Sequence, residues 1–153
     1  MRNAVATIVS LVLIFSAALP LRAASHEQAA PDPQAIAALE ARANQADPRE
    51  RCFLYAQLVY NITELSVKKF AAGQVDAASG LLRQVQSTAQ KIHLATAPRD
   101  KKLKNAEILL NQTSFRLNEL LHSNGYADRE LVEQTIADVD HAQNETMMQL
   151  FQK

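Results

Sequence analysis

Hydrophobic residues recur at spacings of three and four along most of this chain, and the segment 47–73 shows the pattern best. Asp47 can cap a helix N-terminus, Pro48 suits the first helical position, and Glu50 can bond back to the cap. A mostly apolar stripe follows, formed by Cys52, Tyr55, Val59, Ile62, Ser66 and Phe70. Gly73 is typical of the residue that ends a helix. The pattern predicts a long amphipathic helix whose apolar face must be covered.

The same spacing recurs in three further segments, residues 75–96, residues 99–123 and the chain from 128 onward. Short breaks at Pro98 and at Gly125 separate them. Four helices of similar length joined by short turns are typical of an up-down-up-down four-helix bundle. Their stripes are expected to meet in one core, with Val59, Ile62, Leu82, Val85, Leu110, Leu117, Ile136 and Val139 at its centre. We therefore expect an all-α fold.

The N-terminal residues differ from this bundle in composition. Residues 1–25 have a short positive start, an almost wholly apolar run and a small-residue end, which indicate a secretory signal peptide. Residues 26–33 hold two prolines and few apolar side chains, so we expect a disordered lead-in. A single domain then spans 34–153. Its first segment, the Ala-rich stretch 34–46, predicts a short extra helix that must dock on the larger ones.

The predicted signal peptide implies export to the periplasm or the medium. Cleavage after Ser25 fits the small-residue rule, and cleavage after Ala23 is the competing interpretation. An uncleaved membrane anchor is the alternative, although about 18 apolar residues is the lower end of what spans a bilayer. After cleavage we expect no stable insertion in the membrane.

The charge of the chain excludes one class of partner. Lys and Arg total 16 against 16 Asp and Glu, and loss of Arg2 and Arg22 with the leader leaves 14 against 16, a net charge of −2. Nucleic-acid binding usually needs a strongly basic surface, so no nucleic-acid partner is expected.

An antiparallel final hairpin turning at Gly125 is expected to place Lys104 nearest the region of Glu145.

A second apolar line accompanies the main stripe on two of the predicted helices. Phe53, Tyr60 and Val67 follow a spacing of seven, and Ile108 and Phe115 repeat it later in the chain. A helix that is apolar on two faces is either central or has a further partner. These five residues are the candidate partner-contact surface, for a protein partner or for self-association. The alternative is that the short N-terminal helix covers them.

Candidate chemistry is sparse. Glu119-x-x-His122 and Asp138-x-x-His141 are similar to the carboxylate-x-x-His pairs of di-iron bundles, but antiparallel helices would separate the two His residues by roughly 24 Å. We therefore expect no metal site and no cofactor. No nucleophile elbow or glycine-rich phosphate loop is present, so catalytic residues are not expected. Cys52, the only cysteine, lies on the apolar stripe and is expected to be buried, with an intermolecular disulfide as the alternative.

One short segment of the chain resembles part of a known structural repeat. The turn at Gly73 followed by Ala77, Ala78 and Leu82, with Leu65 before it, is similar to the turn and second helix of a tetratricopeptide repeat. Other positions of the repeat do not fit, and no second copy follows. The sequence thus favours an exported, non-catalytic helical bundle with a binding or structural role. The alternatives are a bundle that binds a small ligand or metal, and a tetratricopeptide-like interaction module.

Overall fold

The computed structural model describes residues 31–93, 101–123 and 128–151, and all regular structure in these ranges is helical. Five α-helices are present: α1 (Pro33–Gln45), α2 (Pro48–Ala71), α3 (Val75–His93), α4 (Lys101–His122) and α5 (Arg129–Phe151). The predicted all-α fold is confirmed. The predicted signal peptide and most of the lead-in lie outside the described residues, as do the break at Pro98 and the turn at Gly125.

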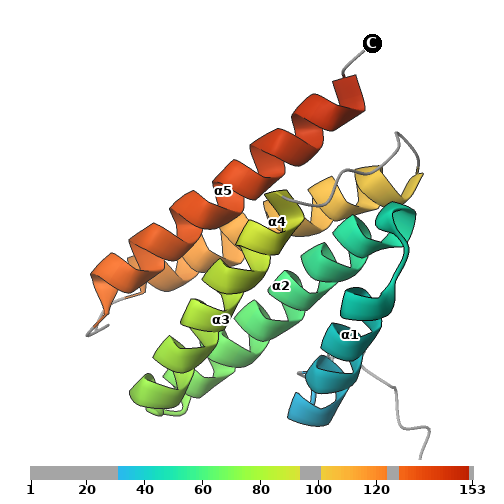
Figure 1. Cartoon of the computed structure of the whole chain (residues 1–153). Helices are drawn as coiled ribbons and strands as arrows, with labels where there is room; N and C mark the ends of the chain where they lie inside the picture. The colour runs from blue at the N-terminus through green and yellow to red at the C-terminus, as the bar shows by residue number, and fades with distance from the viewer. Residues whose placement is uncertain (1–30, 94–100, 124–127, 152–153) are drawn as a thin grey trace, which may run out of the picture.

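The four long helices pack as two antiparallel pairs that lie against each other (Figure 1). In the first pair, the Ser66 hydroxyl of α2 donates to the carbonyl oxygen of Ala78 in α3, at 3.0 Å. In the second pair, Ser114 of α4 donates to the carboxylate of Asp140 in α5, at 2.6 Å. The pairs meet through α2 against α4 and through α3 against α5. Within the described residues, α3 and α4 do not pack on each other, although they follow one another in the chain.

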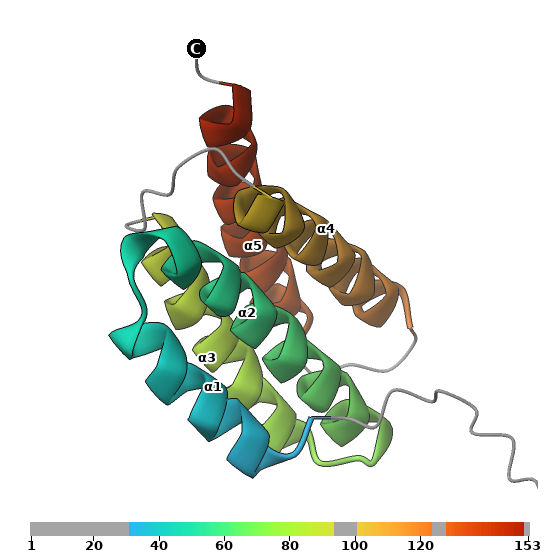
Figure 2. The ribbon, with the colours of Figure 1, turned by 90° about the vertical axis from the view of Figure 1, so that its right-hand side faces the viewer.

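The short helix α1 lies along α2, on the side away from α4 (Figure 2). Its Ile36 and Ala43 are buried. The Tyr55 hydroxyl of α2 donates to the side chain of Asn44, at 3.1 Å. Arg51 donates two hydrogen bonds to the carbonyl oxygen that follows α1, at 2.7 and 3.1 Å. The marginal helix is therefore held by packing and hydrogen bonds to its larger neighbour, as expected.

The ends of α2 follow the signals in the sequence. The Asp47 carboxylate accepts a hydrogen bond from the backbone N–H of Glu50, at 3.1 Å. Gly73 has a φ of 72°, and its N–H and that of Gln74 bond back into the last turn of α2, both at 2.9 Å. This is a Schellman motif, and its left-handed position favours glycine. The predicted start and stop of this helix are confirmed.

The core contains the predicted stripes, with one difference on α5. Seven of the eight residues expected at its centre have no exposed surface, and the eighth, Ile136, is only partly buried. Thr135 takes the fully buried position beside it. A buried threonine is tolerated there because its hydroxyl donates to the carbonyl oxygen of Leu131, at 2.7 Å. Cys52 is also buried, at 1% exposure.

The final hairpin is antiparallel, as expected, but Lys104 has a different environment. Gln143 of α5 donates to Glu107 of α4 at 3.2 Å, which sets the expected alignment. Lys104 is nevertheless exposed, and it forms no ion pair with Glu145. Lys102 pairs with a carboxylate of α2, Glu50, at 3.1 Å. A cation near a helix N-terminus is unfavourable. For Lys102 this unfavourable placement is offset by a carboxylate of α2 and not by one of α5.

The longest helix, α2, has 24 residues and carries Glu64, Lys68 and Lys69 within its second half. Charged side chains interrupt the other long helices in the same way. Among the residues that the structure describes, no helix combines the length and the apolar character needed to cross a membrane.

Candidate functional site

Two ion pairs hold α2 and α4 side by side and in the same direction. Glu50 near the start of α2 pairs with Lys102 near the start of α4, at 3.1 Å. Glu64 pairs with Arg116 further along, at 2.7 Å. Both pairs join residues 52 positions apart, so the two helices keep one register between them. The Glu50 carboxylate also accepts a hydrogen bond from Arg42 of α1, at 3.1 Å. The side chain that was expected to bond back to the helix cap therefore pairs with two cations, Lys102 and Arg42.

Between these ion pairs lie two adjoining hollows, which we call the α2–α4 groove. One has a volume of about 370 Å³ and the other, next to Arg116, about 440 Å³. Tyr60, Leu109 and Gln112 line both hollows. The apolar lining is Phe53, Tyr60, Ile108, Leu109 and Phe115, and the remaining lining is Asn and Gln side chains and Arg116. The groove is thus an apolar strip with hydrogen-bonding amides along its edges.

Four of the five residues predicted as a contact surface line this groove. Phe53 and Tyr60 on α2 are half-buried, whereas Ile108 and Phe115 on α4 are 41% and 64% exposed. Val67 is half-buried against the core and does not line either hollow. Because α1 packs on the other side of α2, it does not cover the apolar line, contrary to the alternative interpretation. The lines of two helices therefore meet in one open groove.

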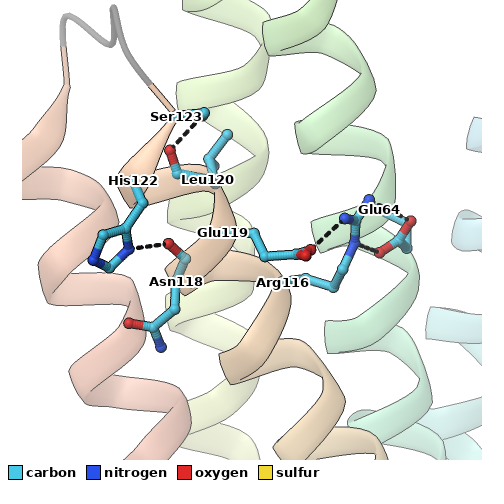
Figure 3. A network of polar contacts seen from close by, with 7 residues as sticks. All are labelled: Glu64, Arg116, Asn118, Glu119, Leu120, His122 and Ser123. Carbon is cyan, nitrogen blue, oxygen red and sulfur yellow. Dashed lines mark hydrogen bonds and ion pairs between the residues drawn. The ribbon is translucent and has the colours of Figure 1, made fainter.

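Arg116 closes one end of the groove with a branched set of ion pairs (Figure 3). Its Nε and Nη2 donate to the two carboxylate oxygens of Glu64, at 2.7 and 3.4 Å, and its Nη1 donates to Glu119 at 2.6 Å. The hydrogen bonds with Glu64 and then with Glu119 raise the pKa of Arg116 above its ordinary value, so the guanidinium stays charged. Two carboxylates around one cation leave this end of the groove with a net negative charge.

Sequence reasoning did not find this network. The pairing of Arg116 with Glu119 is detectable, because residues three apart lie on one helix face. The pairing with Glu64 is not, since only the packing of α2 against α4 brings the two side chains together.

The carboxylate–His pairs that resemble metal ligands serve other contacts. Nδ1 of His122 lies 2.7 Å from a backbone carbonyl oxygen of its own helix, and Glu119 is held by Arg116. On α5, Nδ1 of His141 lies 3.9 Å from the carboxylate of Glu145. In the described part of the chain, no three His, Cys, Asp or Glu side chains gather as a metal site would require.

The groove offers aromatic and aliphatic surface, amide groups and a charged end, which are the elements of a protein-binding surface. Comparison of the chain with protein-family models, with curated proteins and with solved structures finds no match.

Proposed function

We propose that this chain is an exported, non-catalytic protein-binding bundle that uses the α2–α4 groove as its docking surface. In this proposal α2 to α5 form an up-down-up-down four-helix bundle, and α1 is an extra helix that supports α2. The observation that carries it is the exposure of Phe115 and Ile108 on α4, at 64% and 41%, beside the open hollows.

Large apolar side chains gathered on one surface are unfavourable in water, and such patches commonly mark interaction sites. Phe115 is the most prominent of them, and aromatic anchors supply much of the binding energy of protein interfaces. Phe53 and Tyr60 on α2 give a partner two further aromatic rings at the groove floor. A groove between two parallel helices suits an amphipathic helix, whose apolar face packs between them.

The polar residues of the groove fit the same role. Asn and Gln side chains can pair with a partner's backbone or side chains without the desolvation cost of a full charge. The Arg116 network supplies a charged rim that is already held in place before binding. Preorganised groups lose less entropy when a partner arrives.

A photo-cross-linking experiment in the producing cells tests this proposal. A benzophenone amino acid replaces Phe115 in the full chain, and the control places it at Arg83, an exposed position of α3. We expect one defined protein adduct at position 115, of identity established by mass spectrometry and reproduced with the purified partner, and none at position 83. Absence of any protein adduct at 115, with the protein folded and exported, would overturn the proposal.

A further inference from the structure

The outer face of α4 carries a pattern that reads the same in both directions. Six exposed residues lie on it, and successive ones are three or four positions apart except for the adjacent central pair: Lys104, Ile108, Asn111, Gln112, Phe115 and Glu119. Residues so spaced lie on one side of a helix. Lys104 and Glu119 are equally far from the midpoint between Asn111 and Gln112, and so are Ile108 and Phe115.

We propose that the partner in this groove is a second copy of the chain, with the two α4 helices antiparallel about a two-fold axis at that midpoint. This inference rests on the proposed function of the groove and names its occupant. A two-fold interface uses the same patch on both subunits, so residue i meets j while j meets i. The order of residues on α4 satisfies this condition for an apolar pair and for a charged pair.

Charge selects the antiparallel direction. Lys104 is exposed and forms no ion pair with any described residue, whereas Glu119 belongs to the net-negative cluster around Arg116. Antiparallel docking places Lys104 of each copy beside the partner's Glu119, so the interface contains two such pairs. Parallel docking would place lysine beside lysine and glutamate beside glutamate. Like charges side by side in an interface are destabilising.

The proposed axis also brings the apolar pair to the groove. The same axis places the partner's Phe115 against Ile108, which lines the hollow of about 370 Å³ together with Phe53 and Tyr60. An aromatic ring that enters a hollow near the centre of an interface is the usual form of an anchor. Each copy supplies one ring and one hollow, so both exposed phenylalanines are covered at once.

Charge reversal gives a sharp test with the full exported chain. Lys104→Glu and Glu119→Lys each create two like-charge pairs in their own homodimer. We expect each variant to dimerise about tenfold more weakly than the wild type at low salt, as measured by sedimentation equilibrium. Mixed together, the two variants should form a heterodimer, because both of its charge pairs are again opposite. The double variant Lys104→Glu/Glu119→Lys should dimerise more tightly than either single variant, because its two charge pairs across the interface are again opposite.

Arg83→Glu, an exposed charge reversal on α3, is the matched control and should leave dimerisation unchanged. Phe115→Asp should reduce dimerisation about a hundredfold, since it removes both anchors. Circular dichroism melting of each variant verifies that it is folded. A wild-type chain that stays monomeric at all concentrations, or variants with no preference for each other, would overturn this inference. A monomeric chain that cross-links through position 115 to a different protein would overturn it while upholding the proposed function.

Discussion

Arg116 of α4 holds Glu64 of α2 in a two-point ion pair, with Nε to Oε1 at 2.7 Å and Nη2 to Oε2 at 3.4 Å. The side chains are 36% and 20% exposed, so water screens part of their attraction. The pair joins helices that no local signal aligns. Its main role is therefore to fix the register of α2 against α4, and thereby the shape of the groove between them.

The geometry of this pair predicts that Arg116→Lys weakens the fold, because lysine keeps the charge but loses the two-point fork. We expect a loss of up to about 1 kcal/mol at low salt, shrinking as salt is added. A double-mutant cycle with Glu64→Gln, followed by urea unfolding, measures the coupling. The Arg129–Glu133 pair, 67% and 51% exposed within one helix, is the control and should couple more weakly. Equal coupling in both cycles would contradict this role.

Leu110→Ala is predicted to cost about 2–5 kcal/mol, because a fully buried leucine leaves a cavity in the core. Phe115→Ala removes more atoms from the same helix but from an exposed site, so its cost should stay within about 0.5 kcal/mol. Thermal and urea unfolding, at a protein concentration too low for dimerisation, compare the two. Similar losses for both variants would show that the buried stripe of α4 is wrongly assigned.

Gly80→Ala is predicted to stabilise the protein by about 0.5–1 kcal/mol, because Gly80 lies inside α3 and alanine is the better helix former. A Cβ added there meets no atom within 4 Å, so packing does not require the glycine. Gly73→Ala is the opposite control: its φ of 72° disfavours any side chain, and the variant should lose about 1 kcal/mol. Melting temperatures shifted the other way would refute both assignments.

Protein isolated from the exported fraction is predicted to begin at His26, because Ala23 and Ser25 then occupy the two small-residue positions of the cleavage site. Intact-mass measurement and N-terminal sequencing identify the terminus. Replacing Ser25 by a bulky residue should slow processing or move it to the bond after Ala23. Retention of Met1 in membrane-bound protein would instead support the uncleaved anchor.

The sequence is sufficient to predict the helices, because each prediction uses local chemistry. Asp47 and Gly73 act on the turns next to them. The buried stripes, which include Val59 on α2 and Leu117 on α4, follow from helical spacing. The partners of the helices are harder to predict, since they depend on which faces match in space. Lys104 illustrates this: the alignment of its hairpin was predicted, yet its expected contact with Glu145 is absent.

The candidate surface was predictable only in part, because local spacing marks the lines on each helix but not which lines face each other. The spacing of seven marks Phe53 and Tyr60 as a line on one helix, and Ile108 and Phe115 as a line on another. Nothing local states that these lines face one groove, or that Val67 turns to the core. The structure supplies that relationship through the packing of α2 on α4.

That packing also determines when the groove comes into existence during folding. The α2–α3 and α4–α5 hairpins can close through contacts 12 and 26 residues apart, whereas joining them uses contacts 52 and 49 residues apart. Non-local contacts form late because their loop-closure entropy must be paid before they stabilise anything. The groove is therefore created only when the two hairpins associate. A partner that binds it recognises the finished molecule alone and, by mass action, protects that state from opening into its two halves.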